Sequence, residues 1–253
     1  MQFAISSWSM RSHINKDFPV QEFGPHVKAS FGVGAVEVCQ MHIPTPDARR
    51  LDQIVGNYQA AGVRVVNVPI DVGDISQSDD AKREHDLRLI EFWIDVAAYL
   101  GSPAARVNSG SGDLQTAIDS YTRLASYGEK AGVRLVLENH GGLSADLENV
   151  RTLMESAGPN FGTCPDFGNF PEEQRYDGLA MMVPRAAMVH AKTYDFDANG
   201  NFDDFDFPRC LQIVKDAGYA GYLSVEFEGD GDQTQGVQQT IDLLRKLDPS
   251  IAA

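Results

Sequence analysis

An acid, an amide and a histidine directly follow an apolar run near the middle of the chain. Residues 134–142 read RLVLENHGG. Side chains alternate between the two faces of a strand, so Glu138 and His140 project to the same side where this strand ends. Burying either polar side chain costs free energy unless a partner satisfies it, and a metal ion is the simplest such partner. This strand end therefore predicts a metal-binding or catalytic site.

Three later apolar runs also end in a side chain that can bind a metal: Asp166, His190 and Glu226. Three of the four residues have a structural explanation when taken alone, whereas Glu226, between Val225 and Phe227, is the hardest to explain structurally. Glu138 suits a buried ion pair, Asp166 a helix cap or turn, and His190 a hydrogen-bonded core histidine. A bound metal explains all four residues with one cause. Three carboxylates and one imidazole favour Mn²⁺, Mg²⁺, Co²⁺ or Zn²⁺ with open positions for substrate oxygens.

Other polar residues near the strand ends are candidate acid–base or substrate-binding groups. Lys192 follows His190 by two residues and Glu228 follows Glu226 by two, so both are expected to face the same pocket. For Lys192, an ion pair with Glu228 or Asp166 is the alternative to a catalytic role. The remaining candidates for substrate contact are Trp8, His13, Glu37, His42 and Asn108. Glu37 has a second interpretation, as a group that holds a ligand histidine or an arginine.

The elements that must position these groups alternate between strand and helix from end to end. Polar strand ends fall at Ser6, Glu37, Asn67, Asn108, Glu138, Asp166, His190 and Glu226. Their mean separation is about 31 residues over the seven intervals from position 6 to position 226, the length of one βα unit. Eight units predict a single (β/α)8 TIM barrel. An open doubly wound sheet is the alternative, but residues 7–10 (SWSM) are unlike its glycine-rich phosphate turn.

Glycine and proline mark the expected boundaries of these elements. Five helical segments end in a glycine suited to a left-handed conformation, and a strand signal follows within a few residues. These glycines are Gly62, Gly101, Gly132, Gly158 and Gly218. The longest helix is expected from Asp80 to Leu100, and the sixth strand, 161–166, is expected to be weak because Gly162 and Pro165 interrupt it. No linker or shift in composition appears, so residues 1–253 are predicted to form one domain.

Composition and charge exclude several classes of partner. The chain has 253 residues, is 43% apolar and carries a formal net charge of −15. That charge argues against nucleic acid and anionic membranes as partners. No run approaches the roughly 18 apolar residues of a membrane helix and no signal peptide is evident, so a cytoplasmic location is expected. The three cysteines, Cys39, Cys164 and Cys210, are predicted to be reduced and mostly buried.

Four motifs resemble those of the xylose isomerase-like TIM-barrel superfamily, which includes ketose 3-epimerases, inosose dehydratases and endonuclease IV. They are VLENH (136–140), DFGN (166–169), VHAK (189–192) and SVEFEG (224–229), and the resemblance spans essentially the whole chain. It implies one divalent metal, with Mn²⁺ the first choice, held by Glu138, Asp166, His190 and Glu226. It also implies that Glu138 and Glu226 act as an acid/base pair on opposite faces of the substrate.

The resemblance implies an isomerase or epimerase that acts on a small keto-sugar or polyol through an enediolate. A dehydratase or lyase that performs β-elimination is the alternative, because residues 138–142 are similar to both kinds of member. His140 or Lys192 would then protonate the departing oxygen. A non-catalytic sugar-binding barrel is a third interpretation, but it requires a missing ligand and all four are present.

The charged residues and the number of histidines bear on the charge of the substrate and on the number of metal ions. The cationic candidates for the pocket are few, Lys192 and Arg11, which favours an uncharged substrate. Six histidines in all give little support to the trinuclear zinc cluster of endonuclease IV relatives, and the negative charge opposes it. Superfamily relatives often pair through their barrel helices, so the resemblance implies a homodimer.

Overall fold

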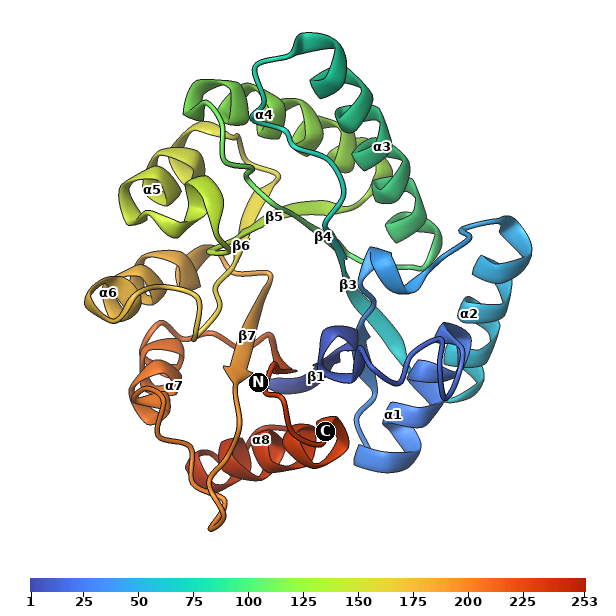
Figure 1. Ribbon diagram of the computed structural model, residues 1–253, viewed down its shortest axis with the longest axis vertical. Coiled ribbons are helices and arrows are strands. Elements are labelled where there is room, and N and C mark those ends of the chain that lie inside the picture. Colours follow the sequence, from blue (N-terminus) through green and yellow to red (C-terminus); the bar gives the residue numbers. More distant parts are fainter.

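Eight parallel strands alternate with eight helices in a computed structural model that describes residues 1–253 (Figure 1). The strands are β1 (Gln2–Ser6), β2 (Ala35–Glu37), β3 (Arg64–Ile70), β4 (Ala104–Val107), β5 (Arg134–Glu138), β6 (Phe161–Cys164), β7 (Met188–Thr193) and β8 (Tyr222–Phe227). The helices are α1 (Phe23–Phe31), α2 (Ala48–Ala60), α3 (Asp80–Tyr99), α4 (Leu114–Ala131), α5 (Leu147–Ser156), α6 (Glu172–Met182), α7 (Phe207–Asp216) and α8 (Gln233–Leu247). Short 3-10 helices are η1 (Ser7–Met10), η2 (Val20–Glu22), η3 (Gln40–His42), η4 (Gly142–Ala145) and η5 (Val183–Arg185).

The strands follow one another in the order β6-β5-β4-β3-β2-β1-β8-β7, and the helices surround them (Figure 1). Each pair of neighbouring strands is parallel. The predicted (β/α)8 TIM barrel is therefore confirmed. None of the helices combines the length and the apolarity that a bilayer crossing requires.

The barrel closes between β6 and β7 through single bridges instead of a continuous ladder. β6 ends at Cys164 because the next residue, Pro165, has no N–H to donate. Backbone hydrogen bonds still cross this seam, from His190 N to Pro165 O at 2.9 Å and from Phe167 N to His190 O at 3.1 Å. The prediction of a weak sixth strand is confirmed, and the seam places Asp166 opposite His190.

Aspartates begin six of the eight helices. A carboxylate oxygen accepts a backbone N–H of the first turn in α2, α3, α4, α5, α7 and α8, from Asp47, Asp79, Asp113, Asp146, Asp206 and Asp232 respectively. Such caps stabilise helix starts, and a negative charge there is also favoured by the helix dipole. Part of the acidic excess thus serves the fold. The five glycines expected after helices all have φ between 69° and 89°, as predicted.

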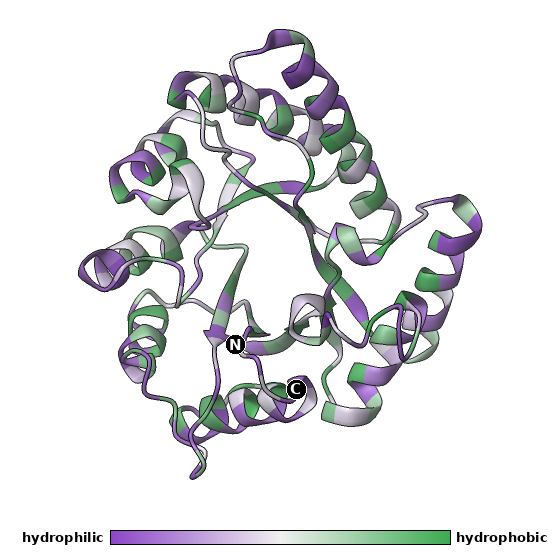
Figure 2. Ribbon diagram, in the orientation of Figure 1, coloured by the Kyte–Doolittle hydropathy of each residue, from purple (hydrophilic) through white to green (hydrophobic).

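Two apolar layers hold the barrel together. The larger contains 60 buried residues, mostly between strands and helices. Figure 2 shows the corresponding pattern, with apolar strands and mixed helices that carry polar residues on their outer turns. The smaller layer takes one residue from each of the first seven strands: Ala4, Ala35, Val66, Ala104, Val136, Cys164 and Met188. These seven residues form an apolar floor across the interior of the barrel.

A polar level lies directly above this floor. In six of the seven strands, the residue two positions later is polar and buried: Ser6, Glu37, Arg106, Glu138, Asp166 and His190. Because strand side chains repeat every second residue, this level faces the barrel interior as the floor does. The strands therefore deliver a ring of buried polar groups to the carboxyl-terminal end, where TIM-barrel enzymes have their active sites.

Candidate active site

Four of the predicted residues converge inside the barrel. Glu138 ends β5, Asp166 follows β6, His190 lies in β7 and Glu226 lies in β8. Each offers one atom that can bind a metal, and these four atoms all lie within 4.8 Å of one another. All four residues are buried. The set that the sequence predicted as metal ligands is thus gathered at one point.

The ring of His190 is held from both sides. Its Nδ1 lies 2.9 Å from Glu138 Oε1 and 3.3 Å from Glu226 Oε2, so this nitrogen faces the cluster. Its Nε2 lies 3.0 and 3.1 Å from the two carboxylate oxygens of Glu37. Asn67 Nδ2 in turn donates to Glu37 Oε2 at 2.6 Å. A carboxylate behind a histidine fixes its tautomer and aims the other nitrogen at a metal, which is the second of the two roles foreseen for Glu37.

The carboxylates of the cluster create a negative potential that favours a cation at its centre. Although burial opposes the charged form, Cys164, Glu37 and Glu226 raise the pKa of His190 well above its ordinary value. Burial raises the pKa of Glu226. The pKa of Glu138 is lowered despite its burial, because His190 and Arg106 stabilise the carboxylate. Three carboxylates around one imidazole thus favour positive charge at this point.

Two carboxylate oxygens without a hydrogen bond support a divalent metal at this point. Glu138 Oε2 and Asp166 Oδ2 are buried and accept no hydrogen bond, and their nearest cationic atoms are Arg106 Nε at 3.1 Å and Lys192 Nζ at 3.4 Å. Leaving such an atom unsatisfied costs free energy. The donor set of three carboxylates and one imidazole nitrogen is one that hard or borderline divalent ions favour. The predicted metal site therefore matches both the chemistry and the unmet bonding capacity of these side chains.

Removal of a bound metal is expected to lower the melting temperature. An ion that binds only the folded state contributes about 2.7 kcal/mol when present at one hundred times its Kd. For a chain of this length, that corresponds to a shift of about 5–10 °C. Calorimetry of Mn²⁺-loaded and chelated protein measures the shift, and reloading should restore it. Asp166→Asn is the control that should respond little to Mn²⁺. Identical melting curves with and without Mn²⁺ would argue against the site.

A cavity of about 320 Å³ opens above the cluster, at the small end of the usual range for ligand sites. Its lining residues are Trp8, Cys39, Met41, Asp71, Arg106, Asn108, Glu138, His140, Lys192, Glu226 and Glu228. Five of the predicted acid–base and substrate-binding residues are among them in addition to the two glutamates: Trp8, Asn108, His140, Lys192 and Glu228. The cavity therefore suits a small ligand in contact with the cluster.

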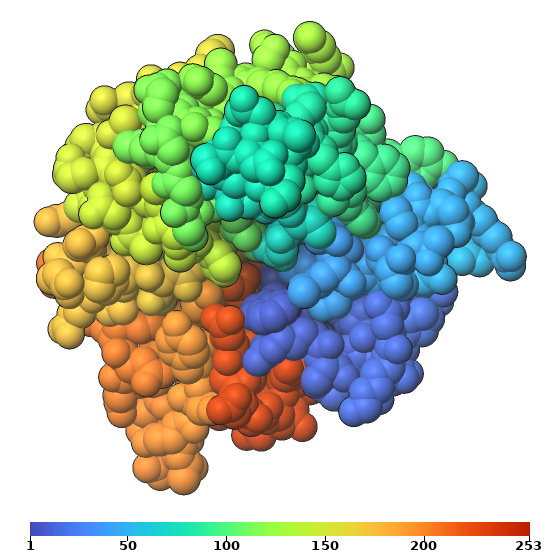
Figure 3. All heavy atoms as spheres, turned by 45° about the horizontal axis from the view of Figure 1, so that its top comes forward, coloured from blue at the N-terminus to red at the C-terminus, as the bar shows by residue number.

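The first and last βα units meet at this cavity. Trp8 Nε1 donates to Glu228 Oε1 at 3.0 Å, although the two residues are far apart in the sequence. In the space-filling view, the N-terminal segment (blue) and the segment after β8 (red) adjoin near the middle of the visible face (Figure 3). The indole of Trp8 is thereby fixed as one wall of the cavity.

Lys192 makes the ion pairs with Glu228 and Asp166 that were expected as the alternative to a catalytic role. Its Nζ lies 2.9 Å from Glu228 Oε2, 3.2 Å from Glu226 Oε1 and 3.4 Å from Asp166 Oδ2. Against the effect of burial, Asp166 and Glu226 raise the pKa of Lys192 well above its ordinary value. Lys192 is therefore an ammonium group, a form that can donate a proton, and its catalytic role stays a prediction.

Two predicted histidines lie outside the cavity lining. His13 Nδ1 lies 2.7 Å from Asp17 Oδ2. His42 is buried in η3 with its Nδ1 2.9 Å from Ser7 Oγ, and burial lowers the pKa of His42 to about 4. Neither contact reaches the cluster. The structure therefore separates His13 and His42 from the groups that converge at the cavity.

Arg106 and Asp71 line the cavity although sequence reasoning missed them. Arg106 Nη1 donates to Asp71 Oδ1 at 2.5 Å and to Asn108 Oδ1 at 2.6 Å. Its Nε lies 3.1 Å from Glu138 Oε2. The signal was present in both cases: Arg106 lies in β4 two residues before Asn108, and Asp71 directly follows β3. Cys39 and Met41, which follow β2, were missed as cavity residues as well.

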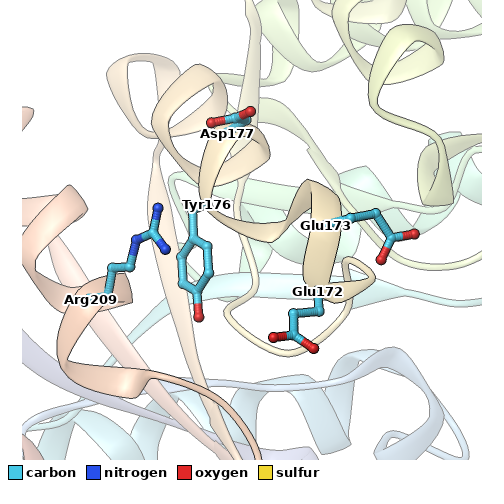
Figure 4. Close-up of a pocket in the computed structure, with 5 residues that line it drawn as sticks. All are labelled: Glu172, Glu173, Tyr176, Asp177 and Arg209. Carbon is cyan, nitrogen blue, oxygen red and sulfur yellow. The ribbon is translucent and has the colours of Figure 1, made fainter.

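A second hollow of about 510 Å³ lies between α6 and α7 and is lined by Glu172, Glu173, Tyr176, Asp177 and Arg209. The Arg209 guanidinium stacks on the Tyr176 ring at 3.7 Å. Figure 4 shows the three carboxylates pointing in different directions rather than toward a common point. This hollow shares no residue with the cavity above the cluster and shows no convergent set of polar groups.

Comparison with known proteins places the chain in a family. Residues 27–247 match the family described as "Xylose isomerase-like TIM barrel". Among curated proteins, the C-glycoside deglycosidase alpha subunit of Arthrobacter globiformis is 40% identical over 79 residues, which are 31% of this chain and 21% of that protein. The aligned segment thus spans about a fifth of that relative's length.

Solved structures share the fold at low sequence identity. The 3-keto-D-glucoside 4-epimerase YcjR from E. coli superposes with a TM-score of 0.78, at 17% identity over 97% of this chain and 99% of that one. The IOLI protein with a bound zinc atom gives a TM-score of 0.78, at 14% identity over 98% of each chain. With a family match that covers most of its length, the chain belongs to the xylose isomerase-like TIM-barrel family.

Proposed function

We propose that the chain is a divalent-metal-dependent isomerase or epimerase that removes a proton next to the carbonyl of a small keto-sugar. The observation that carries this proposal is that two buried glutamates of the cluster also line the cavity. Glu138 Oε1 and Glu226 Oε2 lie 2.9 and 3.3 Å from the same histidine nitrogen, and both residues line the cavity. A substrate seated above the cluster meets both carboxyl groups.

The side chains have separate tasks in this reaction. A divalent ion held by Glu138, Asp166, His190 and Glu226 supplies, when bound, polarisation of the substrate's carbonyl and hydroxyl oxygens. One of the two glutamates takes the proton from the carbon next to the carbonyl. The other returns a proton to the opposite face of that carbon, which inverts it. Lys192 lies 3.2 Å from Glu226 Oε1 and orients that carboxyl group.

The relatives support a keto-sugar as the substrate class. One structural neighbour is described as acting on a 3-keto-D-glucoside, and the curated relative is described as a C-glycoside deglycosidase. Both descriptions concern a sugar that carries a substituent. The panel of substrates to test therefore includes ketoses, inososes and 3-keto-glucosides.

The experiment that tests this function follows carbon-bound protons in D₂O by NMR with the Mn²⁺-loaded protein. We expect deuterium to enter next to the carbonyl while the carbon skeleton and the oxygens stay intact. Chelated protein is the control and should exchange no faster than buffer. Absence of exchange on every compound, from protein with a full complement of metal, would refute the proposal.

β-Elimination is the second candidate, and the position of His140 favours it. His140 lines the cavity two residues after Glu138, and the curated relative is described as a C-glycoside deglycosidase, a name that implies loss of a substituent. Glu138 or Glu226 takes the proton from the carbon next to the carbonyl, and the electron pair of that C–H bond forms a carbon–carbon double bond. The bond to the substituent breaks with its electron pair on the substituent, which takes a proton from His140 or Lys192.

The same D₂O experiment separates the two candidates. Elimination releases water or the substituent after exchange, whereas epimerisation releases nothing. For an eliminase, His140→Gln should retain exchange and lose product release by about 100-fold or more. For an epimerase, the same variant should leave the ratio of exchange to product unchanged.

A further inference from the structure

Both cationic side chains of the cavity are already paired with carboxylates. Arg106 contacts Asp71 Oδ1 at 2.5 Å through Nη1 and Glu138 Oε2 at 3.1 Å through Nε. Lys192 has three carboxylate oxygens within 3.4 Å, as described above. The nearby guanidinium of Arg11 donates to backbone carbonyls, including those of Trp8 and Phe227. An anionic substrate group would therefore meet a carboxylate beside Arg106 and beside Lys192, and would compete with backbone carbonyls for Arg11.

An aspartate side chain occupies the backbone N–H groups of a loop that often binds phosphate in TIM barrels. Such sites are frequently built by the loops after strands seven and eight. Here Asp195, which follows β7, accepts the backbone N–H of Asp230 at 3.1 Å and that of Gly231 at 2.9 Å. A carboxylate of the chain itself thus occupies two N–H groups of the β8 loop and places negative charge beside them.

The wall formed by Asp71 and Arg106 still has free hydrogen-bonding capacity. The bonds from Arg106 and from Asn108 both end on Asp71 Oδ1, and none reaches Oδ2. No hydrogen bond of the protein uses Arg106 Nη2 either. Both side chains line the cavity, and the side chain of Asp71 is 29% exposed. One acceptor and one donor side by side match a sugar hydroxyl, which needs both.

We propose that Asp71, held by Arg106, makes the cavity selective for neutral polyhydroxylated substrates and is the specificity-determining residue that rejects sugar phosphates and sugar acids. This rests on the proposed function for the identity of the site, and goes beyond it in naming the substrate's charge. Like charges repel at short range. With Asp166 of the cluster counted, five carboxylates lie at this site against Arg106, Lys192 and the two positive charges of a bound divalent ion, so one negative charge remains in excess. Of the four carboxylates that line the cavity, Asp71 is the one that is neither a proposed metal ligand nor paired with Lys192.

Binding of D-glucitol and of D-glucitol 6-phosphate to the Mn²⁺-loaded protein tests this selectivity by calorimetry. Neither sugar alcohol has a carbonyl, so neither can be enolised and binding is read independently of turnover. We expect the wild-type protein to bind D-glucitol at least ten-fold more tightly than the phosphate. Asp71→Asn should reduce this preference about ten-fold or more, because it removes one negative charge and frees Arg106 to meet the phosphate.

Two further variants make the result specific. Asp71→Glu keeps the charge and should keep the preference for D-glucitol. Asp80→Asn removes the same charge from a side chain that is 88% exposed, and should leave the preference unchanged. A wild-type protein that binds D-glucitol no better than the phosphate would overturn the proposal. An Asp71→Asn protein whose affinities for D-glucitol and for the phosphate fall equally, so that their ratio is unchanged, would also overturn it. Failure of deuterium exchange would instead count against the proposed enolisation alone.

Discussion

Glu138→Gln and Glu226→Gln should each reduce turnover of the keto-sugar substrate by about 100- to 10,000-fold, the usual contribution of a positioned acid or base. Both residues are buried and line the cavity, where they can reach a bound substrate. An amide of the same shape keeps the packing and cannot accept the proton.

The two variants should fail on opposite faces of the substrate if the two-base mechanism holds. One should lose deuterium exchange when the reaction starts from the first epimer and keep it from the second, and the other should show the reverse. Neither should interconvert the epimers. NMR in D₂O from each pure epimer, at saturating Mn²⁺, measures both effects.

Metal content must be measured in parallel, because both glutamates are also proposed ligands. Glu129→Gln, on the exposed side of α4, is the control that removes a carboxylate without touching the cavity. A metal-loaded Glu138→Gln or Glu226→Gln protein with wild-type turnover would exclude a catalytic role for that residue. Equal exchange from both epimers in both variants would exclude assignment of one base to each face.

Most of this site could be predicted from the sequence because side chains in a strand point to the same face at every second residue. Glu138, Asp166 and His190 lie two residues after floor positions, and each ends or follows an apolar run, so burial and direction could be inferred together. Arg106 obeys the same rule above Ala104 and was still missed. A positively charged residue within a short strand resembles an edge or surface position until its partners, Asp71 and Glu138, are known.

The roles of other residues depend on contacts that no local pattern contains. Glu37 was recognisable as a polar strand end, but its function is set by His190, which lies 153 residues away in the sequence. His13 and His42 follow strand ends by several residues, where η1 and η3 and their connections decide the direction of the side chain. The two-residue repeat predicts the direction of side chains within a strand, and it gives no direction for side chains in the loops beyond the strand end.

Substitution of Glu37 should therefore weaken the metal site although Glu37 is no ligand. Glu37→Gln is expected to lower the affinity for Mn²⁺ by about 10- to 100-fold, the usual cost of losing the carboxylate behind a ligand histidine. The carboxylate lies 3.0 Å from His190 Nε2 and receives a hydrogen bond from Asn67, so it fixes the tautomer that leaves Nδ1 free to bind the ion. A neutral amide can bond to the ring from either end and no longer enforces this choice.

Titration of the metal-free protein with Mn²⁺ by calorimetry measures the loss for Glu37→Gln, and turnover at saturating Mn²⁺ shows whether anything else changed. Because Glu37 contacts the Nε2 side of His190 and does not line the cavity, turnover of the fully loaded variant should stay close to that of the wild type. This outcome separates Glu37 from Glu138, whose loss persists at any metal concentration. Unchanged affinity would mean that packing alone orients His190, and a loss of turnover that saturating metal does not restore would place Glu37 in the reaction itself.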